Sequence, residues 1–219
     1  MKVKVQNKYD QKYFTPHMLV LFLSSYEYNC EKTYKAMNEH MEFVSKYIRD
    51  QQGNRIIRYE TDPKVKSLIV IILLTQDAGF FYVCGRDHHF RPTIVFNLRK
   101  TDLKDPEAVL RGIVFVQEEV IEKMFIPGQV ECWNIIYDLG GMGLTDLPVN
   151  ALKSALQAIS ANYGGRLYKL WMLNSPSSIY FSWKVVKNFL DPVTVDKIHI
   201  IKKNTDEHLW KLYNKNQIE

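Results

Sequence analysis

The chain has 219 residues, of which 46% are hydrophobic and 24% charged, so it is long enough to bury one sizeable core and too apolar to be disordered. Its longest apolar run, Leu68 to Leu74, is far shorter than the roughly 20 residues that cross a bilayer, and the first residues lack the apolar segment of a secretion signal. The net charge of +5 favours anionic surfaces such as lipid headgroups. A nucleic-acid site would interleave basic and aromatic residues along a strand, and the sequence contains no such run. We therefore expect a cytoplasmic protein that is peripheral to membranes and binds no nucleic acid.

Two helices are predicted at the N-terminus. Thr15 and Pro16 are typical of a helix start, and His17 to Tyr28 reads as a short apolar helix. From Glu31 to Arg49 apolar residues recur every three or four positions, which places them on one face of a second helix. We expect a helical hairpin in residues 1–54 and a second domain in residues 55–219.

The next segments lead into a sheet. Between Asp62 and Gln76 the cap favours a helix and the β-branched residues favour a strand, and we favour a buried helix. Phe80 to Cys84 and Thr93 to Arg99 then read as two strands joined by the polar turn from Gly85 to Arg91.

Helices and strands alternate from Asp105 onward. Asp105 and Pro106 start a helix with an apolar side, and Gly164-Gly165 supplies the left-handed end of a later one. The remaining elements are strand Val130–Tyr137, helix Pro148–Tyr163, strand Tyr168–Leu173, helix Pro176–Leu190, strand Lys197–Lys202 and helix Thr205–Tyr213. This order predicts an α/β fold with a mainly parallel sheet and crossover helices.

Candidate catalytic and metal sites are weak. The loop Gly140–Gly143 follows a strand as phosphate-binding loops do, but it lacks their lysine and hydroxyl, so we interpret it as a connector. His88-His89 beside Asp87 fits a solvated turn better than a metal site because no third ligand has a suitable spacing. Ser175, before Pro176, fits a helix cap rather than a nucleophile.

The cysteines carry no motif either. Cys30, Cys84 and Cys132 show no CxxC spacing, and we expect reduced, mostly buried thiols. No nucleophile, base and oxyanion hole can be assembled from the chain, so we expect no enzyme activity and no cofactor.

The helix from Pro176 to Leu190 is apolar over more than one face. One stripe carries Ile179, Trp183, Val186 and Leu190, while Tyr180 and Phe181 project elsewhere. Such a helix is either fully buried in a core, or covers an internal cavity on one side and contacts a membrane on the other.

Four short motifs occur in one order. They are Gly85-Arg86-Asp87 followed by Arg91-Pro92, Tyr137-Asp138-Leu139-Gly140-Gly141, Leu173-Asn174-Ser175-Pro176, and Phe189-Leu190-Asp191-Pro192-Val193-Thr194-Val195-Asp196-Lys197-Ile198. In order and spacing they resemble the CRAL-TRIO lipid-binding family of retinaldehyde-binding, tocopherol-transfer and yeast phosphatidylinositol-transfer proteins. The resemblance extends from Leu19 to the end of the chain.

The resemblance implies a pocket for one lipid-like ligand, floored by the sheet and covered by a gate helix. The floor would comprise Phe96, Trp133, Ile135, Tyr137, Leu170 and Met172, the walls Leu110, Ile113, Ile159 and Tyr163, and the gate Ile179, Trp183, Val186 and Leu190. Alternation along strands and spacing along helices independently support these facings.

The resemblance also implies a phosphate site that is only partly retained. In the phosphoinositide-transfer branch an arginine, a glutamate, a threonine and a lysine hold the headgroup. Thr194 and Lys197 match, but Tyr26 stands at the arginine position and Gly164-Gly165 replaces the glutamate region. Arg166 could supply a second cation.

We therefore expect a monomeric protein that binds a lipid or other hydrophobic ligand and transfers or presents it between membranes, docking transiently on anionic surfaces. An alternative is a protein-interaction scaffold whose pocket is filled by side chains, as the bulk of Phe96, Trp133, Tyr137 and Tyr163 would favour. A second alternative, an enzyme acting on a lipid, lacks a nucleophile and base. The apolar positions are generic, so they do not distinguish one ligand from another.

Overall fold

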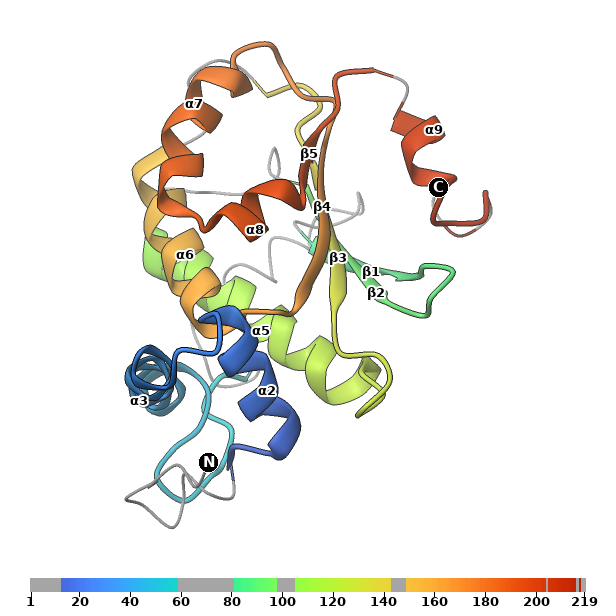
Figure 1. The fold of residues 1–219 in the computed structure, drawn as a ribbon. Helices are drawn as coiled ribbons and strands as arrows, with labels where there is room; N and C mark the ends of the chain where they lie inside the picture. The colour runs from blue at the N-terminus through green and yellow to red at the C-terminus, as the bar shows by residue number, and fades with distance from the viewer. Residues whose placement is uncertain are drawn as a thin grey trace.

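The computed structural model describes residues 13–58, 81–97, 105–142, 149–203, 205–215 and 217. Within them the chain forms one five-stranded sheet, ordered β1-β2-β3-β4-β5 (Figure 1). The strands are β1 (Phe81–Arg86), β2 (Pro92–Asn97), β3 (Trp133–Asp138), β4 (Leu167–Leu173) and β5 (Ile198–Ile200). Only β1 runs antiparallel to its neighbour within this sheet. The predicted α/β fold is confirmed, whereas the helix expected from Asp62 to Gln76 lies outside the described residues.

Capping side chains start several helices. Thr15, Asn29, Asp105 and Asp191 each accept a hydrogen bond from a backbone N–H in the first turn, which satisfies donors that have no partner within the helix. The described helices are α2 (Pro16–Ser25), α3 (Cys30–Tyr47), α5 (Pro106–Met124), α6 (Val149–Asn162), α7 (Ile179–Val186), α8 (Pro192–Asp196) and α9 (Thr205–Leu209), with the 3-10 turn η2 (Lys187–Phe189) after α7.

The sheet separates two apolar cores because successive residues of a strand point to opposite faces. Figure 1 shows α5, α6, α7 and α8 on one side of the sheet and α9 on the other. We call the side covered by α5 to α8 the inner face. Two rows cross it from β2 to β5, namely Ile94–Ile135–Leu170–Ile198 and Phe96–Tyr137–Met172–Ile200. On the opposite face Ile136 and Trp171 pack with Leu209 and Tyr213.

The β1–β2 turn is fixed by one buried carboxylate. Asp87 accepts hydrogen bonds from the backbone N–H groups of His89 and Arg91, from the Arg91 guanidinium, and from the side-chain amide of Asn134 on β3. Since these bonds favour the ionised form, the pKa of Asp87 is lowered although burial acts in the opposite direction. Asp87 therefore has a structural role, and the described residues contain no group of three or more side chains suited to a metal ion.

Helices α2 and α3 contact α6 through a buried histidine. His40 of α3 is 3% exposed and is surrounded by the rings of Tyr13, Phe14 and Phe22. Its Nδ1 lies 2.9 Å from Oδ1 of Asn162 at the end of α6, so this nitrogen donates and Nε2 accepts from the Tyr13 hydroxyl at 3.2 Å. Burial lowers the pKa of His40 to about 4, which keeps the ring neutral at physiological pH.

Several predicted boundaries need correction. The helix predicted from Pro176 to Leu190 is shorter: α7 spans Ile179–Val186 and continues only as η2. Leu190 and Asp191 are both extended, and at Asp191 this geometry is favoured by the proline that follows it, Pro192. The segment that begins at Pro192 is itself a short helix, α8, rather than a turn, and the strand after it is limited to Ile198–Ile200.

Candidate functional site

All six residues predicted for the pocket floor lie on the inner face. Phe96, Tyr137 and Met172 share one row, Ile135 and Leu170 the next, and Trp133 precedes Ile135 by two positions on β3. The period-two alternation that predicted their facing is therefore observed. Whether they line a ligand pocket stays a prediction.

One end of the inner face is filled by aromatic side chains. Trp133 is 1% exposed and its ring lies 5.5 Å from Phe125 and 5.9 Å from Tyr163, measured between centroids. The Tyr163 hydroxyl donates to the Glu118 carboxylate of α5 at 2.9 Å. Burial, together with the adjacent charge of Glu118, raises the pKa of Tyr163 well above its usual value. Trp133 and Tyr163 thus close this end as packed core.

The other end of the inner face is more exposed to solvent. Tyr137 and Met172, near the carboxyl ends of β3 and β4, are only partly buried. The Tyr137 ring packs 5.1 Å from Phe96, between centroids, but its hydroxyl has no hydrogen-bond partner among the described residues. Desolvation raises the pKa of Tyr137 to about 12. An unpaired phenol in apolar surroundings, part of which stays accessible, is a suitable donor for an ester or carbonyl group of a ligand.

The predicted wall residues lie on two helices that cover this face. Leu110 and Ile113 of α5 are buried in the same apolar core as the floor. Ile159 of α6 is partly buried against it. The walls therefore contact the floor directly at α5 and less tightly at α6.

The predicted gate is anchored at one end and more open at the other. Ile179, the first residue of α7, is buried in the inner core. Trp183 and Val186 in α7, and Leu190 after η2, are half-buried. On the outside Phe181 is 74% exposed, and Tyr180 and Val185 are also exposed. The helix is therefore apolar on two sides, and one of them faces solvent.

Ser175 does not cap α7. Its backbone N–H donates to the carbonyl of Ile201 and its hydroxyl donates to the carbonyl of Met172, so it links the end of β4 to the segment after β5. Ser178 precedes α7 and makes no side-chain capping bond. The sequence pattern of serine before proline predicted a cap, but pairing between distant strands determines the role of Ser175.

The predicted phosphate residues already have partners within the protein. Arg166 donates to the backbone carbonyl of Glu131 at 3.1 Å and forms an ion pair with its carboxylate at 2.8 Å. The Lys197 ammonium donates to the carbonyl of Leu167 at 2.8 Å, which leaves two protons for other acceptors. Thr194 lies in α8, where its N–H donates to Asp191. No described contact joins Arg166, Thr194 and Lys197, and their joint role stays a prediction.

The two positions that depart from the phosphoinositide-binding pattern, Tyr26 and Gly164-Gly165, have a structural explanation. A Cβ on Gly164 would lie 2.7 Å from the hydroxyl of Ser25, and one on Gly165 would lie 3.0 Å from Leu21, so α2 fills the space that a side chain would need. Tyr26 is partly buried, and its pKa is raised by desolvation and by the negative charges of Glu39 and Asp191. Two carboxylates near this phenol make the position unfavourable for an anion.

Comparisons with known proteins agree with this architecture. The family model for the CRAL/TRIO domain matches residues 76–219. The chain belongs to the CRAL/TRIO domain family. It is 30% identical over 128 residues to the Sec14 cytosolic factor of Schizosaccharomyces pombe, which covers 52% of this chain and 45% of that protein.

Two further matches cover more of the chain. The chain is 30% identical over 149 residues to the phosphatidylinositol/phosphatidylcholine transfer protein SFH4 of Arabidopsis thaliana, over 61% of this chain and 24% of that protein. The crystal structure of Sfh5 matches with a TM-score of 0.66 at 10% identity, over 90% of this chain and 67% of the Sfh5 chain, which supports the fold. The chain spans less than half the length of the Sec14 cytosolic factor and of SFH4. In the part of the chain that the structure describes, no helix is long and apolar enough to span a membrane.

Proposed function

We propose that the protein binds a lipid or similar hydrophobic ligand between the inner face and the segment formed by α7, η2 and α8, and carries it between membranes. The observation that carries this proposal is the partial exposure of Tyr137 and Met172 on the inner face, where a hydroxyl without a hydrogen-bond partner among the described residues lies beside apolar side chains. Burying an acyl chain there would contribute about 0.8 kcal/mol per methylene.

The outer surface of α7 and α8 would dock on the membrane. Phe181, Val185 and Val193 are exposed there, and Lys184 and Lys187 are exposed beside them. An apolar patch with adjacent cations suits an interface rich in anionic lipid. The protein would act as a monomer on the cytoplasmic side, would release its ligand by movement of α7, and would need no cofactor and catalyse no reaction.

Relatives named as phosphatidylinositol transfer proteins support a phospholipid ligand. Lys197, together with Thr194 in α8, would contact the phosphate of that lipid. The partners of Arg166 and the packing of α2 on Gly164-Gly165 favour a smaller set of headgroup contacts than four residues would provide.

The test is uptake of a fluorescent phosphatidylcholine from vesicles, with ligand identity established by native mass spectrometry and organic extraction of the purified protein. Val186→Trp adds bulk on the half-buried side of α7 and should abolish uptake with little change in melting temperature. Val185→Trp, one position along and exposed, is the matched control and should take up lipid normally. Equal uptake by both variants would contradict the proposed position of the ligand.

A second candidate function is a protein-interaction scaffold with the same fold. It is favoured by the packing of Trp133 with Phe125 and Tyr163, which fills one end of the inner face. Protein that releases no lipid on extraction and takes up none from vesicles would support the scaffold over the carrier.

A further inference from the structure

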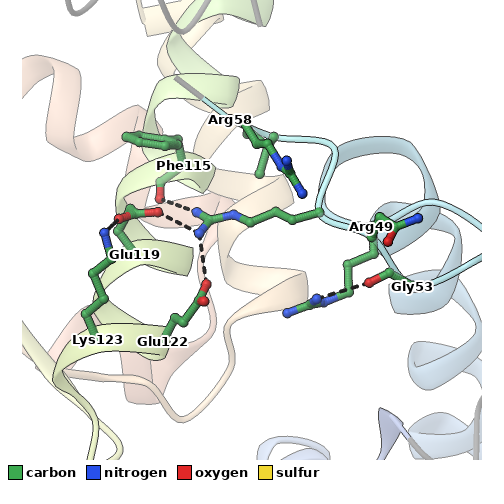
Figure 2. Close-up of a pocket in the computed structure, with 10 residues that line it drawn as sticks. Arg49, Gly53, Arg58, Phe115, Glu119, Glu122 and Lys123 are labelled. Atoms are coloured by element: carbon green, nitrogen blue, oxygen red, sulfur yellow. Dashed lines mark hydrogen bonds and ion pairs between the residues drawn. The ribbon is translucent and has the colours of Figure 1, made fainter. Parts of the chain in front are cut away.

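A polar pocket of about 640 Å³ lies between the loop that follows α3 and one side of α5 (Figure 2). None of the residues predicted for the lipid site lines it. Its volume is within the range of small-molecule sites in proteins. Its charged lining comprises Arg49, Arg55, Arg58, Glu119, Glu122 and Lys123.

The loop that carries the arginines is held in a defined shape. The Asp50 carboxylate accepts hydrogen bonds from the N–H groups of Gln52 and Asn54 and from the side-chain amide of Asn54. Arg49 and Arg55 are directly opposite each other in an antiparallel bridge. Directly opposite residues in such a bridge place their side chains on the same side, where like charges repel. The loop therefore places the two arginines on the same side of this bridge.

One arginine of the pair is neutralised by α5. The Arg55 side chain is 13% exposed and forms ion pairs with Glu119 at 2.6 Å and Glu122 at 2.9 Å. Figure 2 marks the ion pairs of Glu119 and Glu122 with dashed lines. Lys123 shares the Glu119 carboxylate. The two carboxylates that line the pocket are thus committed to Arg55 and Lys123.

The other two arginines form no ion pair with a described carboxylate, although the charge of Arg49 acts on Glu118. Arg49 donates to the carbonyl of Gly53 at 3.2 Å and forms no ion pair with a described residue. Arg58 is exposed and makes neither a hydrogen bond nor an ion pair with any described residue. Glu118, another carboxylate of α5, does not line the pocket and accepts its hydrogen bond from Tyr163. Among the described residues that line the pocket, four cations therefore face two carboxylates, a surplus of two positive charges.

We propose that this pocket binds a phosphomonoester through Arg49 and Arg58. Such a group carries about −1.5 to −2 charges at pH 7, which matches the surplus. A guanidinium donates through a planar fork that fits phosphate oxygens in pairs. The phosphate could belong to a soluble ester or to a lipid headgroup, and the two sources are distinguished experimentally.

The experiment measures binding of inositol hexakisphosphate by calorimetry and binding to phosphatidylcholine vesicles with and without phosphatidic acid. The double variant Arg49→Gln with Arg58→Gln should weaken binding roughly 100-fold, about tenfold for each guanidinium–phosphate interaction that is removed. The control double variant, Lys203→Gln with Lys211→Gln, removes the same charge at two exposed lysines that flank α9. It should bind both probes within a few-fold of the original protein. If the Arg49/Arg58 double variant loses binding to inositol hexakisphosphate but still binds phosphatidic acid vesicles, the natural ligand is a soluble ester. If it loses binding to both probes, the natural ligand is a lipid headgroup.

The proposal is overturned if the original protein binds neither probe, or if the two double variants bind equally. Arg58→Gln alone guards against a folding defect, because Arg58 is exposed and has no described partner. It should weaken binding about tenfold at an unchanged melting temperature. Uptake of phosphatidylcholine should be unaffected in this variant, so the outcome is independent of the carrier function.

Discussion

Phe181 offers the most direct test of membrane docking. A phenylalanine has roughly 200 Å² of surface, so at 74% exposure Phe181 presents about 150 Å² to solvent. At about 25 cal/mol per Å², covering all of it would contribute about 4 kcal/mol and covering half of it about 2 kcal/mol. Phe181→Ala should therefore weaken partitioning onto vesicles roughly 30-fold when half of the side chain is immersed.

The assay is co-sedimentation with vesicles of phosphatidylcholine and phosphatidylserine over a series of lipid concentrations. Phe90→Ala is a matched control, because Phe90 is 65% exposed on the β1–β2 turn, away from α7 in Figure 1. Neither side chain contributes to a core, so both variants should keep the original melting temperature. The reasoning is refuted if Phe181→Ala partitions like the original protein, or if Phe90→Ala loses as much binding.

Three further predictions concern the residues that hold the candidate site together. The pKa of His40 is lowered to about 4, against roughly 6.5 in an unfolded chain. The contribution of the neutral ring to the free energy of unfolding is therefore fully present above pH 6.5 and is lost as the pH falls toward 4. The difference in unfolding free energy between the original protein and His40→Gln should shrink by about 2 kcal/mol from pH 7 to pH 5 in urea titrations, and a constant difference would contradict this origin. Gly165→Ala should cost about 1 to 2 kcal/mol, since Gly165 has φ +76° and its new Cβ would approach Leu21, and an unchanged urea midpoint would show that α2 adjusts freely. Lys197→Ala should weaken binding to anionic vesicles and also cost about 1 kcal/mol because it removes the hydrogen bond to Leu167, whereas a stability loss without a binding change would make Lys197 purely structural.

Much of the fold could be predicted from local patterns. The start of α5 follows from Asp105 and Pro106, because capping and the fixed backbone angle of proline act within one turn. The facing of Ile135 and Tyr137 follows from alternation along a single strand. The family could also be predicted, because its motifs are short, ordered and continuous in sequence.

Whether side chains fill the space over the inner face or leave room for a ligand could not be predicted in the same way. The family resemblance, supported by facing, predicts Trp133 and Tyr163 as pocket residues, and only the structure shows that their rings pack together and that Trp133 packs on Phe125. These residues are far apart in sequence, and no local pattern specifies whether large rings meet or leave a space. Tyr137 had the same predicted facing, and only the folded structure shows that its hydroxyl has no hydrogen-bond partner among the described residues and that burial raises its pKa.

The sequence by itself therefore determined the class of fold, the strand facings and the family, because caps, periodicity and motifs act over a few residues. The tertiary structure decided which side chains have partners: it committed Arg166 to Glu131, placed α2 against Gly164-Gly165, and left Arg49 and Arg58 without an ion pair to any described carboxylate. Packing and ion pairing depend on distances between segments that are remote in the chain, and those distances exist only once the chain has folded.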